Sequence, residues 1–90
     1  PAQESVADTL SQEPVVVVDQ ALTTAFASLT PRELEIVVAV ASGRSNDQIA
    51  AEMFLSPFTV KTHANRAMTK VGARDRAQLV AYAYRAGLVT

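Results

Sequence analysis

Polar side chains recur on one face of the segment between Pro57 and Gly72, at the spacing of a helix. Lys61, Thr62 and Asn65 lie together on that face when residues advance by about 100°. A lysine ammonium donates to guanine O6 and N7, an asparagine amide pairs with adenine, and a threonine methyl contacts thymine. These three residues are therefore candidates for reading base edges in a DNA major groove.

A second set of polar residues is suited to phosphate oxygens rather than bases. Helix N-terminal amides, hydroxyls and cations bind anions without regard to base sequence. We expect such contacts to position the helix on DNA. Periodicity alone is equally consistent with a solvated helix face at Lys61, Asn65 and Arg66. The candidates for DNA backbone contact are Asn46, Ser56, Thr59, Arg66 and Lys70.

Several ring-bearing side chains lie near these candidates in the sequence. Phe54 is expected in the core, whereas Phe58 either covers apolar surface or meets a sugar or thymine methyl. A lone histidine at a face boundary, here His63, is more often a packing or orienting residue than a phosphate ligand. Tyr82 and Tyr84 are too few for a base-stacking platform, and we expect one of them to be buried.

Charge is divided unevenly along the chain. The net charge of −1 combines residues 1–28, which hold four acidic and no basic residues, with residues 29–90, which hold eight basic and five acidic residues. Residues 61–76 alone carry five basic residues against one acidic residue. This local excess of positive charge is typical of a surface that faces phosphates.

Composition excludes several other classes of function. The chain has no cysteine and one histidine, so we expect no disulfide, no protein metal site and no cofactor. The absence of a glycine-rich phosphate loop and of a paired-carboxylate cleft predicts that the chain is not an enzyme. No apolar run approaches the length of a membrane span and no signal pattern opens the chain, which predicts a soluble cytoplasmic protein with no membrane partner.

The helices that must position these residues share one local start pattern. Thr30-Pro31-Arg32-Glu33 and Ser45 to Gln48 both have capping-box spacing, and Ser56-Pro57 places a cap before a proline at the first helical position. Gly43 and Gly72 suit left-handed helix stops. The predicted helices are residues 31–41, a short helix from Ser45 that stops soon after Met53, a third from Pro57 to Gly72, and a fourth from Asp75 to Gly87.

The second and third predicted helices are joined by only about three residues, the spacing of the turn in a helix-turn-helix unit. In the third helix, the face opposite the polar one is apolar, and its small alanines allow close approach to the other helices. That face comprises Val60, Ala64, Ala67 and Val71. The predicted fold class is therefore all-α, a four-helix, bundle-like domain with a helix-turn-helix.

Residues 1–28 differ from the rest of the chain. Their acidic opening leads to the apolar run Val15–Val18, which needs a neighbour to cover it. From Asp19, a suitable helix cap, apolar residues recur at helical spacing. We therefore predict a linker over residues 1–28 with a short helix at 19–28, followed by one domain over 29–90.

The fourth predicted helix carries the candidate subunit contact. Gln78, Leu79 and Tyr82 belong to a stripe with three- and four-residue steps that includes apolar side chains expected at the surface. These three residues are candidates for a dimer interface, and the alternative is that Leu79 and Tyr82 pack inside the monomer. The residues expected in the core are Val80, Ala83 and Tyr84.

Several motifs resemble the LuxR-type helix-turn-helix domain of bacterial transcription regulators, over about two thirds of the chain. Leu29–Glu33 is similar to the family's opening motif, Gly43–Ala50 to its scaffold helix and Leu55–His63 to the entry of its recognition helix. The resemblance continues through Arg74–Val80 and Gly87–Val89. The departures from the family pattern are Phe58, where Lys is common, and Ala67 and Thr69, where bulkier or basic residues are common.

This resemblance implies a four-helix domain that binds two-fold related sites on double-stranded DNA as a homodimer, often through its last helix. Base contact would fall on Lys61, Thr62 and Asn65. The family also implies an input domain, and 28 residues are too few for a phosphate-accepting receiver. We therefore expect the output half of a two-component response regulator, with the receiver domain of the parent chain as a partner, whose phosphorylation releases the recognition helix and the dimer surface. An acyl-homoserine-lactone-binding input is the alternative.

Two further interpretations stay open. Region four of a sigma factor shares the Leu-Thr-Pro-Arg-Glu opening and would make RNA polymerase a partner, although Lys61-Thr62-His63 and Gly87-Leu88-Val89 fit it less well. A protein-interaction module is the second, because Val15–Val18 and a linker helix could pair with another protein. Salt dependence separates DNA binding from this second interpretation, since phosphate contacts weaken steeply with salt.

Overall fold

The computed structural model describes residues 19–90, so the predictions made for Val15–Val18 and the rest of residues 1–18 lie outside the described residues. Within residues 19–90 the chain is helical and has no strand, which confirms the predicted all-α class. No helix in this part is long and apolar enough to cross a membrane. The helices are α2 (Gln20–Phe26), α3 (Pro31–Ala41), α4 (Asn46–Met53), α5 (Pro57–Val71) and α6 (Arg76–Arg85).

The helix starts form as their local chemistry predicts. The Thr30 hydroxyl accepts from the Glu33 N–H at 3.1 Å, and the Glu33 carboxylate accepts from the Thr30 N–H at 2.9 Å. Ser45 and Gln48 form the same reciprocal pair at the start of α4. At α6, Asp75 caps the Gln78 N–H as predicted. The side chains in the first turns therefore set where these helices begin, before any tertiary packing is considered.

Left-handed residues end α3, α4 and α5. Gly43 and Gly72 have φ values of 87° and 73°, as predicted for glycine stops. Phe54 ends α4 in the same conformation, with φ 56°, although it carries a side chain. Its ring is 95% exposed, so the prediction that Phe54 belongs to the core is wrong. The left-handed cap turns the chain between α4 and α5, and Leu55 packs against the core in its place.

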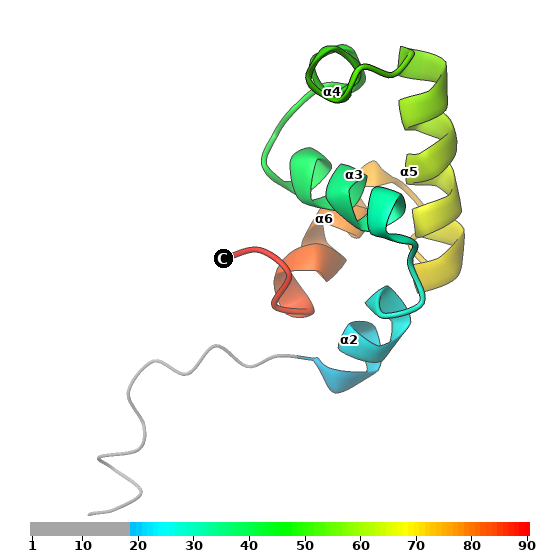
Figure 1. The fold of residues 1–90 in the computed structure, drawn as a ribbon. Helices are drawn as coiled ribbons and strands as arrows, with labels where there is room; N and C mark the ends of the chain where they lie inside the picture. The colour runs from blue at the N-terminus through cyan, green and yellow to red at the C-terminus, as the bar shows by residue number, and fades with distance from the viewer. Residues whose placement is uncertain (1–18) are drawn as a thin grey trace, which may run out of the picture.

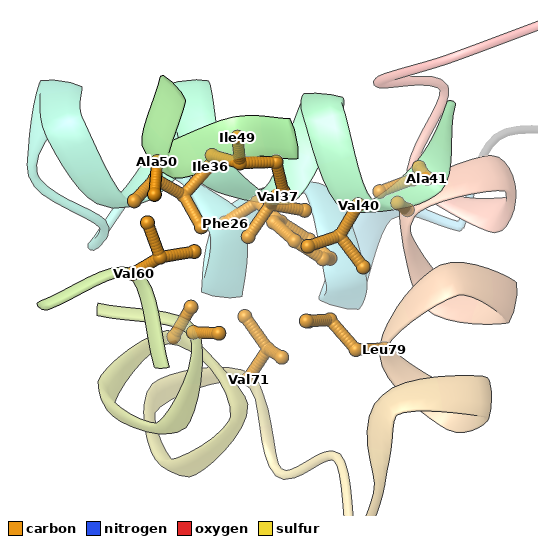
Figure 2. Close-up of a cluster of buried hydrophobic side chains, with 14 residues drawn as sticks. Phe26, Ile36, Val37, Val40, Ala41, Ile49, Ala50, Val60, Val71 and Leu79 are labelled. Carbon is orange, nitrogen blue, oxygen red and sulfur yellow. The ribbon is translucent and has the colours of Figure 1, made fainter. Parts of the chain in front are cut away.

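The helices surround one apolar core. In Figure 1, α5 runs along one side of the molecule, with α4 near its beginning and α2 toward its other end. α3 packs against both α5 and α6, and α4 packs against α5. Figure 2 shows Ile36, Val37 and Val40 of α3 meeting Val60 of α5 and Leu79 of α6. Each such fully buried side chain contributes about 1.5–3 kcal/mol relative to an exposed one.

The short helix α2 packs on α5 and forms polar contacts with the C-terminal end of α6. Phe26 is buried in the shared core, and the Asp19 N–H donates to the Arg85 carbonyl at 2.8 Å. The Arg85 guanidinium lies 3.2 Å from the Asp19 carboxylate, and the Thr23 hydroxyl donates to the Ala86 carbonyl at 3.2 Å. The predicted linker helix is therefore present and rests on the domain that follows it.

Glu33 is the buried charged residue within residues 19–90, with 3% of its surface exposed. Its Oε1 atom accepts from Lys70 Nζ at 2.7 Å as well as from the Thr30 N–H. The Lys70 ammonium, together with the Thr30 backbone hydrogen bond, lowers the pKa of Glu33, and burial opposes this shift. This carboxylate joins the first turn of α3 to the last turn of α5.

The lowered Glu33 pKa predicts an acid-sensitive contribution to stability. Below about pH 4.5, the ordinary value, the unfolded carboxyl takes up a proton before the folded one. The free energy of unfolding should therefore fall as the pH falls through that value toward the lower folded pKa. Glu33→Gln keeps a capping-box acceptor but removes the charge. It should cost about 1–3 kcal/mol at pH 7 and lose this slope, as measured by denaturant unfolding across pH.

Glu35→Gln is the matched control, because Glu35 is exposed and pairs with Arg32 at the surface. That variant should keep the slope of the native chain. An unchanged slope in Glu33→Gln would assign the acid sensitivity to other carboxylates.

The left-handed conformation of Phe54 predicts a stabilising substitution. Glycine adopts a positive φ without steric cost, and the exposed Phe54 ring contributes little packing in the folded chain. Phe54→Gly should therefore raise the free energy of unfolding by roughly 0.5–1 kcal/mol, which corresponds to a few degrees in Tm. Thermal unfolding followed by circular dichroism measures the shift. A lower Tm would show that the ring makes stabilising contacts.

Candidate nucleic-acid interface

The outer face of α5 presents the three candidates for base contact. Lys61 and Asn65 are exposed and Thr62 is partly buried, while Val60 and Ala64 beside them point into the core. The predicted separation of the two faces of this helix is confirmed. Farther along the helix, a shallow surface hollow is lined by Thr62, Asn65, Arg66, Thr69 and Lys70.

Hydrogen bonding within α5 determines which groups on this face are free. The Thr62 hydroxyl donates to the Phe58 carbonyl at 3.0 Å, and the Thr69 hydroxyl donates to the Asn65 carbonyl at 3.1 Å. Within residues 19–90, the side chains of Lys61, Asn65 and Arg66 make no hydrogen bond or ion pair. The face thus offers an ammonium, an amide and a guanidinium to a partner.

The N-terminus of α5 lacks the reciprocal capping box that α3 and α4 have. The Ser56 hydroxyl accepts from the Thr59 N–H at 3.0 Å and lies 2.9 Å from the Thr59 hydroxyl. Because Thr59 occupies the position of the capping-box acid or amide, no acceptor among the described residues reaches the Ser56 N–H. No acidic residue lies in the first turn of α5. This helix start is therefore electrostatically suited to a phosphate oxygen.

Asn46 is held in place by an arginine that the sequence did not single out as a site residue. Arg76, at the start of α6, donates to the Asn46 Oδ1 atom and to the Arg44 carbonyl, each at 2.7 Å. Because the two residues are 30 positions apart in the sequence, no local motif predicts their interaction. Because Oδ1 is occupied by Arg76, the Asn46 amide nitrogen is the group left for an anion.

Lys70 differs from the other candidates for backbone contact. Its ammonium already pairs with the buried Glu33 carboxylate, and within residues 19–90 it is the cation that neutralises this acid. Releasing it to a phosphate would leave a buried carboxylate without its partner, which is costly. Lys70 therefore has a role in the fold. Its side chain is 37% exposed and an ammonium has two further N–H donors, so its contact with the DNA backbone stays a prediction in which the Glu33 pair is kept.

Two ring-bearing residues of α5 have contrasting surroundings. The Nδ1 atom of His63 is buried without a hydrogen-bond partner among residues 19–90, so that nitrogen is not available to a phosphate. Phe58, by contrast, is 78% exposed and lies at the beginning of the helix. It therefore does not cover the core, which removes one of the two roles considered for it.

The candidate dimer residues of α6 separate into different environments. Leu79 has 0% exposure, and Figure 2 shows it directed into the core, so its side chain is not at the surface. This is a correction: the stripe on α6 faces the core at Leu79 because that side of the helix packs on α3. Gln78 is partly buried, and its Oε1 atom accepts from the Arg74 N–H at 2.7 Å.

The two tyrosines of α6 are both at least partly accessible. Tyr82 packs partly against the core, and the Arg85 guanidinium lies over its ring, 5.4 Å from the centroid. Tyr84 is 46% exposed, which corrects its expected place in the core. Ala83 is buried as predicted, whereas Val80 is only partly buried.

Comparison with known proteins supplies the family. Residues 27–83, more than half of the chain, match the bacterial regulatory proteins of the luxR family. The chain belongs to the luxR family. The match covers α3, α4 and α5 whole and most of α6, which hold the candidate contacts described above. The luxR match favours this family over the sigma-factor interpretation.

Curated relatives of this luxR-family chain are regulatory proteins. It is 45% identical over 62 residues to the transcriptional regulatory protein LiaR of Bacillus subtilis, covering 69% of the chain and 29% of LiaR. It is 47% identical over 60 residues to the uncharacterized transcriptional regulatory protein YxjL of the same species, covering 67% of the chain and 28% of YxjL. It is 39% identical over 64 residues to the response regulator protein VraR of Staphylococcus aureus, covering 71% of the chain and 31% of VraR. The chain thus spans roughly 30% of the length of these relatives.

Membership of the luxR family places the chain among DNA-binding transcription regulators. The assignments of Lys61, Thr62 and Asn65 to bases, and of Asn46, Ser56, Thr59, Arg66 and Lys70 to the DNA backbone, stay predictions. What the fold supplies is one surface on which the α5 candidates are presented together.

Proposed function

We propose that this chain binds double-stranded DNA in a sequence-specific manner and acts as the output domain of a bacterial response regulator. The observation that carries the proposal is the outer face of α5, where Lys61, Asn65 and Arg66 have no partner among the described residues. These polar and cationic groups make no hydrogen bond or ion pair within residues 19–90, and the helix that carries them follows a three-residue turn. Such a helix is suited to insertion into a major groove.

Each exposed group on α5 has a role in this proposal. Lys61 donates to guanine, Asn65 pairs with adenine, and the methyl group of Thr62 contacts thymine, because its hydroxyl already donates to the Phe58 carbonyl. Lys61 and Thr62 lie in the first half of α5 and Asn65 just past its midpoint, so the three lie toward the N-terminal part of a recognition helix, which meets base edges.

Backbone contacts orient α5 in the groove. The Ser56 N–H and the Thr59 hydroxyl bind a phosphate at the start of α5, and the Asn46 amide binds another from α4. Arg66 supplies a free positive charge farther along α5. These contacts carry no base information, so they make binding salt-dependent without adding specificity.

A homodimer on a two-fold symmetric site is the second part of the proposal. Gln78 and Tyr82 remain the candidates for the subunit contact on α6, and the exposed Ala81 lies between them in sequence. A small side chain at this position permits close approach of a second α6. Leu79 supports this surface from inside the core rather than contacting the partner.

The parent protein is proposed to carry a receiver domain ahead of this chain. The support comes from the response regulator protein VraR, of which the chain matches 31%. In the proposed mechanism, an unmodified receiver covers α5 and the α6 surface, and phosphorylation shifts the population toward an open form. Because its partner is bacterial DNA, we place the protein in the cytoplasm. RNA polymerase is a further candidate partner of the DNA-bound form.

Selection of duplexes from a random DNA pool by this chain, followed by sequencing, tests the central claim. We expect enrichment of an inverted repeat, since a two-fold dimer reads two equal half-sites. Affinity for the enriched duplex should fall steeply between 50 and 200 mM salt, by an amount set by the number of phosphate contacts. Enrichment of a single half-site would retain DNA reading but contradict dimer binding. No enrichment, or binding of proteins that is insensitive to salt, would favour the interaction-module interpretation.

Two substitutions on α5 separate base contacts from backbone contacts. Asn65→Ala should cost about 1–3 kcal/mol on the selected duplex and relax preference at one position of each half-site. Arg66→Gln should weaken binding to all duplexes and reduce the salt slope by about one. Fluorescence anisotropy on matched and single-base variants measures both effects. Arg32→Gln removes the same charge from α3, where Arg32 pairs with Glu35, and serves as the control. A uniform loss in Asn65→Ala would contradict its assignment to a base.

A further inference from the structure

Phe58 exposes a large apolar ring at the beginning of the otherwise polar outer face of α5. Its side chain is 78% exposed and does not belong to the residues that pack against the core. In helical register, Phe58 lies one turn before Thr62 and two turns before Asn65, on the same stripe of α5. The ring therefore continues the surface that we propose enters the major groove.

Given DNA binding as the proposed function, we propose that Phe58 is a specificity-determining residue that recognises a thymine through its C5-methyl group. In the major groove, thymine is the base whose edge presents an apolar group. The other base edges present donors and acceptors, which a phenyl ring would desolvate without returning a hydrogen bond. A ring at this position consequently favours thymine over the other three bases.

The neighbouring Thr62 strengthens this assignment. Its hydroxyl donates to the Phe58 carbonyl at 3.0 Å, which directs the oxygen toward the helix backbone and leaves the methyl group for outside contact. Phe58 and Thr62 together form a short apolar strip one helical turn long. Lys61 lies beside this apolar strip, and the Ser56 N–H lies just before it in the sequence. Positive electrostatic potential therefore flanks the strip. DNA, with phosphates at the groove edges and a methyl group inside, fits that arrangement.

Phe54, four residues before Phe58, provides a matched comparison. It is 95% exposed but lies in the left-handed cap of α4 rather than on the α5 stripe. Two exposed phenyl rings, one on the recognition stripe and one off it, allow a general effect of surface aromatic residues to be separated from a positional one. Phe54→Gly also suits its backbone conformation, so it should not unfold the chain.

The test replaces the thymines of the selected duplex one at a time by deoxyuridine, which removes only the C5-methyl group. The Kd is measured for the native chain, Phe58→Ala, Phe58→Leu and Phe54→Gly. One uridine in each half-site should weaken the native chain by about fourfold per lost methyl contact. Phe58→Ala should bind the thymine and uridine duplexes equally at that position. Phe58→Leu should keep part of the discrimination, and Phe54→Gly should keep all of it.

Several results would overturn the proposal. The assignment fails if Phe58→Ala discriminates uridine from thymine at every position as strongly as the native chain, or if the selected half-site contains no thymine. It also fails if Phe54→Gly, rather than Phe58→Ala, loses discrimination. Circular dichroism melts establish that each variant is folded, and Phe58→Leu supplies an apolar replacement should the alanine variant unfold. Failure of DNA binding itself appears earlier, as the absence of any enriched duplex.

Discussion

One carboxylate oxygen of Glu33 holds together the two helices that matter most for the proposed interface. It accepts from the Thr30 N–H at the start of α3 and from Lys70 Nζ near the end of α5. The same atom thus completes a helix cap and accepts from the ammonium that neutralises the buried carboxylate. Its lowered pKa reflects this double use, because both donors favour the ionised form. An uncharged acceptor could complete the cap, but it would not hold the Lys70 ammonium with the same strength.

This constraint fixes the direction in which α5 presents its outer face. Lys70 holds the C-terminal end of α5 on α3, while Val60 anchors its N-terminal end in the core. Ala64 and Ala67 between these anchors are buried and small, so the helix lies close to its neighbours. A helix held at both ends and along one side has little freedom to rotate about its axis. Its remaining polar groups are accordingly presented in a fixed arrangement, which lowers the entropic cost of binding.

Sequence patterns predicted the parts of this structure that depend on neighbouring residues. The bounds of α3 were predicted correctly because Thr30, Pro31 and Glu33 determine its start within one turn, and Gly43 its end. The residue that ends α4 is less predictable, because Phe54 adopts a left-handed conformation for which glycine is the usual residue. Its apolar character suggested burial, whereas its backbone conformation turns it outward.

Interactions between distant residues could not be predicted in the same way. The Glu33–Lys70 pair spans 37 residues and the Arg76–Asn46 pair spans 30, and neither leaves a local signature. Periodicity places Leu79 and Tyr82 on one stripe of α6. It does not determine which edge of that stripe packs against α3. Leu79 is enclosed and Tyr82 only partly so, a difference that arises from packing alone. The predicted contacts of Lys61 and Asn65 depend on a partner that the fold itself does not contain.

The contacts of α2 with α5 and with the end of α6 connect the recognition domain to the segment that leads into it. Asp19 caps α2 and pairs with Arg85, and the Arg85 guanidinium lies over the Tyr82 ring. Displacing α2 would therefore remove a charge partner from Arg85 and also withdraw Phe26 from the core that contains Leu79. The Asp19 pair is partly exposed, so its energy is small and the contact is easily broken. The segment that leads into the domain is thus connected to the α6 surface through Asp19 and Arg85, and to the core and α5 through Phe26 and the packing of α2.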